Sequence, residues 1–214
     1  MKNEPISSLT HFIGALLSIA GLVLLILFAS KYGNVWHIVA FSIFGSSLIL
    51  LYFASTLYHL IPADKKIKSV FRRIDHSMIY ILIAGTYTPV CLIALRGGWR
   101  WSLFGVIWGL AIMGVVYKIT TKKISGWIPV IFYILMGWLV LIAFLPLVRA
   151  LPIKGILWLV MGGVFYTIGT IFFWLDNILP KKKWFGMHEV FHLFVIAGSF
   201  SHFWLMLNYI LYIS

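Results

Sequence analysis

Three histidines, one aspartate and one serine stand out because they interrupt stretches that are otherwise apolar. His188 and His192 are four residues apart, which places both imidazoles on one face of a helix. Ser55 and His59 have the same spacing, and Asp75 follows a pair of arginines. Three neutral imidazoles with one open position form a common catalytic zinc site, and a nearby carboxylate can hold or deprotonate the bound water. The residue types therefore point to a zinc centre with Asp75 beside it.

Each of these residues also has a simpler explanation. His188 and His192 could lie at the membrane interface and bind lipid phosphate, and His59 could be an ordinary residue at a helix end. Asp75 could cap the amino end of a helix, where the helix dipole and the two arginines favour a carboxylate. Ser55 could hydrogen-bond to its own helix backbone. The metal site becomes the favoured interpretation if all of these residues lie at one depth in the membrane.

The segment from His188 to His192 also spells H-E-x-x-H, the motif in which zinc proteases use the glutamate as general base. A third histidine ligand is missing at the spacing that such proteases use. His202 comes ten residues after His192, which is ~15 Å along a helix axis, and Asp176 lies upstream rather than on a later helix. The protease therefore remains a second alternative, and Glu189 is expected to cap its helix or to face solvent.

The elements that must position these residues are membrane helices. Hydrophobic residues make up 62% of the 214 residues, charged residues 10%, and the mean hydropathy is +1.03. A soluble domain carries about 25% charged residues, so a soluble globule is excluded. The single cysteine, Cys91, excludes an internal disulfide and any metal site built on several thiolates. The excess of basic residues lies between apolar segments, so no nucleic-acid partner is expected.

Seven apolar runs predict an all-α bundle of seven transmembrane helices in a single domain, residues 1–214. Each run is close to the ~20 residues that a spanning helix needs, and tryptophans lie near several of the expected ends. Continuous runs of this length do not suit a transmembrane β-barrel. The expected helices cover about residues 12–29, 35–61, 74–95, 101–119, 127–148, 155–175 and 188–212.

Positive charge predicts the orientation. Lys and Arg number 12 in the segments on the N-terminal side and 5 in those on the other side, and cytoplasmic loops collect positive charge. We expect a cytoplasmic N-terminus and an external C-terminus. The second helix then ends at His59, the third begins at Asp75 and the seventh begins at His188, all in the cytoplasmic leaflet. This shared depth favours the metal site over the separate explanations.

The full pattern resembles the progestin and adipoQ receptor superfamily, in its bacterial hemolysin III branch. It comprises Ser55 to His59, Asp75, and His188 with His192, and the stretch from Glu4 to Gly14, with Thr10 and His11, is also similar. The resemblance implies a seven-helix bundle in the plasma (inner) membrane of a bacterium. It implies a zinc ion held by His59, His188 and His192, with Asp75 contacting the zinc-bound water and Ser55 beside the site.

Eukaryotic members of this superfamily resemble lipid-amide hydrolases related to alkaline ceramidases, whereas bacterial members are described as hemolysins or membrane-homeostasis proteins. This chain departs from the receptors because it has no soluble N-terminal region, so no protein hormone is expected as a partner. It also has Ser7 where the bacterial pattern usually has asparagine.

The sequence thus predicts a zinc-dependent hydrolase of a lipid amide. The substrate is a membrane lipid that enters sideways from the bilayer, and Asp75 receives the proton. The alternative is a non-enzymatic homeostasis, sensor or cytolytic protein with structural zinc.

Three further histidines carry smaller expectations. His76 is interfacial or assists the site, and His11 lies at a helix end or hydrogen-bonds near the site. His202 makes an interhelical hydrogen bond. Close helix packing is expected at Gly162, Gly163 and Gly169.

Overall fold

The structure, a computed structural model, describes residues 5–61, 64–121, 127–176, 178–179 and 186–213. Within these residues it contains seven apolar helical segments long enough to cross a membrane, which confirms the predicted all-α class. They are α1 (Pro5–Tyr32), α2 (Val35–Leu60), α3 (Lys65–Pro89) with the π-helical η1 (Val90–Ala94), α4 (Gly97–Thr120), α5 (Trp127–Trp138) with η2 (Leu139–Ala143) and α6 (Phe144–Ala150), α7 (Ile153–Leu175), and α8 (Met187–Asn208) with η3 (Ile210–Tyr212).

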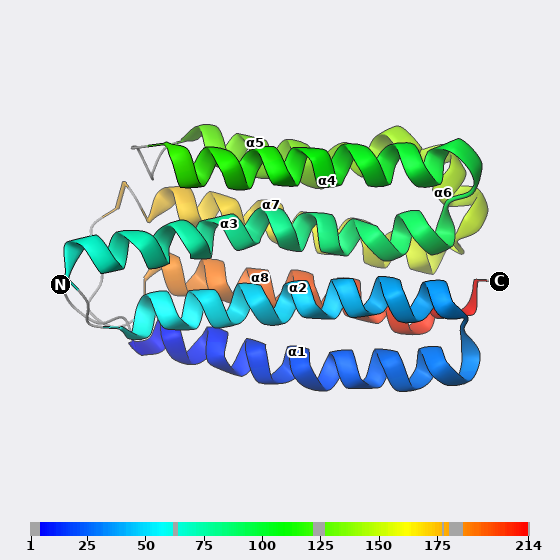
Figure 1. The fold of residues 1–214 in the computed structure, drawn as a ribbon, viewed down its shortest axis with the longest axis horizontal. Coiled ribbons are helices and arrows are strands. Elements are labelled where there is room, and N and C mark those ends of the chain that lie inside the picture. Colours follow the sequence, from blue (N-terminus) through cyan, green and yellow to red (C-terminus); the bar gives the residue numbers. More distant parts are fainter. Residues whose placement is uncertain (1–4, 62–63, 122–126, 177, 180–185, 214) are drawn as a thin grey trace.

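The helices form a bundle in which segments distant in sequence are neighbours (Figure 1). α1 packs against both α2 and α8, so the first and last spans of the chain share an interface. The end where α1 and α8 begin and α2 ends is called the histidine end below, because it carries His59, His188 and His192. α8 therefore starts beside the end of α2, and residues from the two helices can meet.

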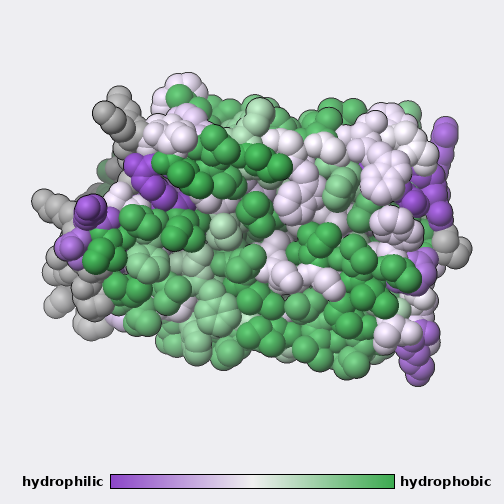
Figure 2. All heavy atoms as spheres, in the orientation of Figure 1, coloured by the Kyte–Doolittle hydropathy of each residue, from purple (hydrophilic) through white to green (hydrophobic). Residues whose placement is uncertain are grey.

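The outer surface of the bundle suits a lipid environment. Figure 2 shows hydrophobic residues over the middle of the visible face and hydrophilic residues at its two ends. Large apolar side chains are exposed in the middle of the spans, such as Leu17 at 59% and Leu135 at 62%. An apolar surface of this extent is unfavourable in water but not in lipid. The chain is a multi-pass integral membrane protein.

The third span begins earlier than the sequence suggested, and this corrects the position of Asp75. α3 starts at Lys65, and the Asp64 side chain caps it by accepting from the backbone N–H groups of Lys66 and Ile67 at 2.8 Å. Asp75 thus lies ten residues inside the helix, so the expectations that it opens the helix and that it caps the helix are both wrong. The cationic residues before it resembled a loop, but they continue the helix beyond the apolar run.

The fifth span is interrupted, whereas the sequence predicted one continuous helix. Between α5 and α6 the chain tightens into the 3₁₀ segment η2, which leaves backbone groups without their α-helical partners. The Tyr87 hydroxyl on α3 compensates for this: it lies 2.8 Å from the carbonyls of Met136 and Gly137 and accepts from the Val140 N–H at 2.7 Å. Such pairing is required inside a membrane, because no water is available there.

Two of the three glycines expected at helix contacts are needed for close approach. A Cβ at Gly162 would lie 2.5 Å from the His202 ring, and one at Gly169 would lie 3.1 Å from the Phe194 Cβ. Gly163 differs, because its nearest neighbour would be 3.8 Å away on Trp138, an ordinary contact. α7 and α8 thus pack closely at Gly162 and Gly169.

The charge asymmetry gives a test of orientation. With 12 basic residues on the N-terminal side and 5 on the other, a reporter fused after Ser214 should be active only on the external side of the membrane. Alkaline phosphatase and green fluorescent protein fusions at that position report the two sides separately. A fluorescent, phosphatase-negative C-terminus would place the histidine end outside and reverse the expected topology.

Candidate metal centre

The structure brings His59, His188 and His192 together at the histidine end of the bundle. Their ligand atoms all lie within 4.8 Å of one another, so the three residues could hold a metal ion. His59 comes from the last turn of α2, and the other two come from the first two turns of α8. His59 and His192 are each 1% exposed, and the side chain of His188 is 19% exposed. A bound ion would therefore be shielded from bulk water.

The distances between the imidazoles suit a tetrahedral ion. The Nε2 atoms of His59 and His188 are 3.2 Å apart. Two nitrogens that each bind zinc at 2.0–2.1 Å with tetrahedral angles are separated by about 3.4 Å. The donor set, three imidazoles without a thiolate, is also the one that catalytic zinc sites use. The residues present therefore fit zinc.

Hydrogen bonds behind the cluster orient the ligand nitrogens. The Thr10 hydroxyl donates to the Ser7 carbonyl at 3.0 Å and lies 3.2 Å from Nδ1 of His192. On the other side, Nδ1 of His188 faces the Asp176 carboxylate at 3.8 Å. Because Nδ1 of both rings lies near an oxygen atom, Nε2 is the nitrogen available to a metal, as in the carboxylate–histidine pairs that support metal ligands. Thr10 and Asp176 are thus supporting residues that spacing alone did not reveal.

Asp75 and Ser55 lie beside the three histidines rather than among them. Ser55 is buried and hydrogen-bonds to the Asp75 carboxylate, which also lies in the electrostatic field of His59 and Lys118. Both Asp75 and Ser55 line the same cavity as His188 and His192. The proximity expected from the sequence is present, although Asp75 reaches the site from the interior of α3 and not from its first turn.

Glu189 has a different position from the one a protease base would need. Its carboxylate accepts from the Ser7 hydroxyl at 2.6 Å and from the Gly186 N–H at 2.7 Å, so it caps α8 and ties α1 to it. The capping expectation is confirmed, whereas the expected exposure to solvent is wrong because Glu189 is 9% exposed. The short Ser7 side chain serves as the link to Glu189. Both carboxylate oxygens are occupied, which gives the protease alternative no support.

His11 belongs to the site. Its ring stacks on the His192 ring with centroids 3.5 Å apart and an interplanar angle of 12°, and it meets Tyr52 edge-on at 5.0 Å. The expectation of a helix-end residue is wrong because α1 begins at Pro5, which places His11 one and a half turns into the helix. Its ring covers one face of His192, one of the three clustered histidines.

His76 and Lys118 form a polar group next to Asp75. Nζ of Lys118 lies 3.3 Å from Nδ1 of His76, and His76 lines the cavity, so His76 is near the site. Lys118 is only 3% exposed. The Arg73 guanidinium donates to the Lys118 carbonyl at 2.8 Å and so closes the end of α4. The sequence indicated Lys118 only as a topology signal.

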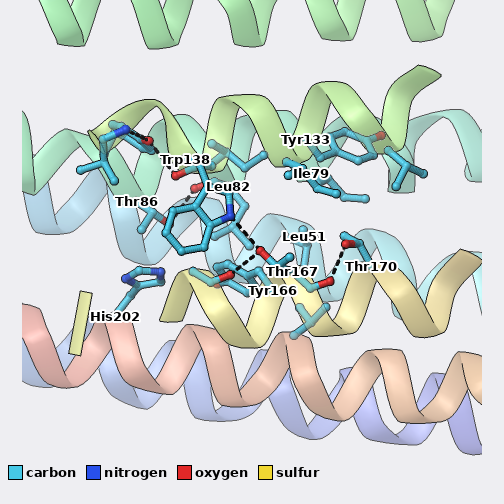
Figure 3. Close-up of a pocket in the computed structure, with 18 of the residues that line it drawn as sticks. Leu51, Ile79, Leu82, Thr86, Tyr133, Trp138, Tyr166, Thr167, Thr170 and His202 are labelled. Carbon is cyan, nitrogen blue, oxygen red and sulfur yellow. Dashed lines mark hydrogen bonds between the residues drawn. The ribbon is translucent and has the colours of Figure 1, made fainter. Parts of the chain in front are cut away.

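A long cavity connects the metal centre with the interior of the bundle. It has a volume of about 160 Å³ and begins beside Asp75, His188 and His192. It continues between α3, α5, α7 and α8 as far as His202, and Figure 3 shows the side chains that line it, with His202 at one end and Tyr133 toward the other. Most lining groups between the two ends are apolar. An apolar chain could therefore lie along it with a polar group at the histidines.

Comparisons with known proteins agree with this architecture. The family model described as haemolysin-III related matches residues 1–203. A hemolysin-3 homolog of Bacillus subtilis (strain 168) is 45% identical over 209 residues, 98% of this chain and 95% of the relative. Hemolysin-3 of Bacillus cereus is 44% identical over 211 residues, 99% and 93% of the two chains. The human monocyte to macrophage differentiation factor is 26% identical over 182 residues, which cover 82% of this chain and 72% of the relative. The chain belongs to the haemolysin-III related family.

Proposed function

We propose that this protein is a zinc-dependent hydrolase of a lipid amide. The observation that carries the proposal is the position of the three histidines and Asp75 at the head of a long apolar cavity. A structural metal needs no cavity beside it, whereas a catalyst needs room for its substrate next to the reactive group. The resemblance to lipid-amide hydrolases gives the reaction, and the residues at the site give the chemistry.

Each residue has a defined part in that reaction. His59, His188 and His192 would hold zinc, which supplies a Lewis acid for the amide carbonyl and activates water. Asp75 accepts the proton that the attacking water gives up as the new C–O bond forms. The same carboxyl group then passes the proton to the amine as the C–N bond breaks, so the products are a fatty acid and an amine. Ser55 orients the Asp75 carboxylate through its hydrogen bond.

The surface near the cavity supports sideways entry of the substrate. Three lining residues are also exposed on the outer, lipid-facing surface: Leu141 at 52%, Phe144 at 46% and Val160 at 38%. The first two lie on the interrupted fifth span and the third on α7. A membrane lipid could enter between these spans without crossing water. We place the protein in the plasma membrane of a bacterium, with the histidine end in the cytoplasm and no protein hormone as a partner.

The names of the bacterial relatives offer a second candidate, because both are called hemolysins. In that case the protein would be cytolytic, or a sensor or homeostasis protein in which metal joins α2 to α8. A pore needs a polar path through the membrane, and the cavity is lined mainly by apolar groups between its two ends. The enzyme is therefore the function that the site supports best.

Purified protein tests the proposal directly. Zinc-loaded and chelator-treated samples are incubated in detergent with long-chain lipid amides, and released fatty acid is measured by mass spectrometry. We expect release only in the zinc-loaded sample, with recovery when zinc is added back to the chelated one. A panel of lipid amides and esters that yields no zinc-dependent product would reject the hydrolase and leave the sensor or cytolytic function.

A further inference from the structure

The far end of the cavity contains a histidine that the metal centre does not use. His202 lies on α8, ten residues after His192, and lines the cavity. Figure 3 shows its ring pointing away from α8 into the space near Trp138 and Thr86. The residue is 5% exposed, and its Nδ1 atom is buried without a hydrogen-bond partner among the described residues. The interhelical hydrogen bond expected from the sequence is therefore absent at this atom.

The surrounding chain makes room for this ring. A Cβ at Gly162 would lie 2.5 Å from Nε2 of His202, so a larger residue on α7 would displace the imidazole. On another side, the Tyr166 ring packs against it with centroids 5.5 Å apart. Burying an unpaired polar group costs free energy, and polar residues inside a membrane usually serve a function. His202 is thus held in place at the edge of the cavity, with its buried Nδ1 atom unpaired among the described residues.

The other polar groups at this end of the cavity are already paired. The Thr86 hydroxyl donates to a backbone carbonyl of its own helix at 2.8 Å, and the Tyr166 hydroxyl lies 3.0 Å from a serine of α8. The Trp138 indole donates to the Thr167 hydroxyl at 3.0 Å, as the dashed line in Figure 3 shows. A ligand hydroxyl that reaches this end would therefore pair with the imidazole of His202, which lines the cavity.

The separation of the two ends defines the ligand. His192 and His202 are ~15 Å apart along the helix axis, which is about twelve carbon–carbon bonds at roughly 1.25 Å of projected length each. A hydroxyl group both donates and accepts, so it pairs with either tautomer of the imidazole. We propose that His202 is a second ligand contact, selecting lipids whose acyl chain carries a hydroxyl group about twelve carbons from the group held at the metal centre. This proposal rests on the proposed function in one respect only, the position of the lipid head group at the metal centre.

Binding of fatty acids, which are not hydrolysed, tests this selection. The probes are 12-hydroxystearate, 6-hydroxystearate and stearate, whose carboxylates stand in for the amide at the metal centre. Affinities for the purified, zinc-loaded full chain in detergent are measured by competition against a fluorescent fatty acid. We expect 12-hydroxystearate to bind about fivefold more tightly than 6-hydroxystearate, the typical effect of one hydrogen bond. The 6-hydroxyl group would lie too close to the metal centre to reach His202.

His202→Phe supplies the matched variant, because phenylalanine fills a similar space without a nitrogen. It should lose the preference for the 12-hydroxy isomer while its affinity for stearate stays within about twofold of wild type. Equal affinities for the two isomers in wild type, or a preference that persists in His202→Phe, would overturn the proposal. If the variant does not fold, the comparison of the two isomers in wild type tests the proposal by itself. A clear preference in a protein that hydrolyses no amide would reject only the proposed function.

Discussion

Asparagine in place of Asp75 is expected to lower hydrolysis of a long-chain lipid amide by ~10²-fold or more, the usual contribution of a general base. The amide side chain has nearly the same shape, so it can keep the hydrogen bond with Ser55. It cannot accept the proton from the attacking water. Zinc content and thermal stability should remain close to wild type, since Asp75 is not one of the three clustered ligands. Product release and bound zinc are measured on the same preparations.

Glu189→Gln is the matched control for this substitution. Glutamine can still accept from the Gly186 N–H through its carbonyl oxygen, and its amide N–H can donate to the Ser7 hydroxyl, so both contacts that Glu189 makes are kept. Its activity should stay near wild type, whereas a protease-like mechanism predicts the reverse order of the two variants. If Asp75→Asn retains full hydrolysis, Asp75 is not the base. If wild type is inactive and Asp75→Asn still abolishes a membrane phenotype, Asp75 is a structural partner in a sensor.

Alanine at His59, His188 or His192 should remove most of the zinc from the purified protein. Each substitution deletes one of three clustered ligands, and a site with two imidazoles binds zinc far more weakly than one with three. Inductively coupled plasma mass spectrometry gives the metal content per chain after dialysis. The loss should be similar for the three variants, although they lie on two different helices.

His202→Ala is the control for metal content, because it removes a buried histidine from the same helix. Its ring lies ~15 Å along the axis from His192 and contacts Gly162 and Tyr166 rather than the cluster. This variant should therefore keep its zinc. Equal zinc content in all four variants would show that the three histidines do not form the binding site.

Spacing along the chain was sufficient to predict seven spans and the meeting of the three histidines. The i, i+4 spacing of His188 and His192 fixes their common face, and the apolar runs place His59 at the matching helix end. The position of Asp75 within its helix could not be read in this way. Cationic residues before it suggested a loop, but Asp64 and the helix dipole stabilise an earlier start.

Contacts between distant segments account for the features that the sequence did not reveal. The support of His192 by Thr10 and the stacking of His11 depend on α1 packing against α8, about 180 residues apart. The interruption of the fifth span depends on the Tyr87 hydroxyl from another helix. No local pattern encodes such pairings, because each needs the neighbouring helix in its final position.

X-ray absorption at the zinc edge tests the central claim most directly, because it reports the ligands of the metal in the wild-type protein. We expect one zinc per chain, with three imidazole nitrogens at about 2.0–2.1 Å and one exchangeable oxygen in the open position. A hydroxamate inhibitor should replace that oxygen. A spectrum with four protein ligands would make the metal structural, and purified protein that binds no zinc would contradict the site itself.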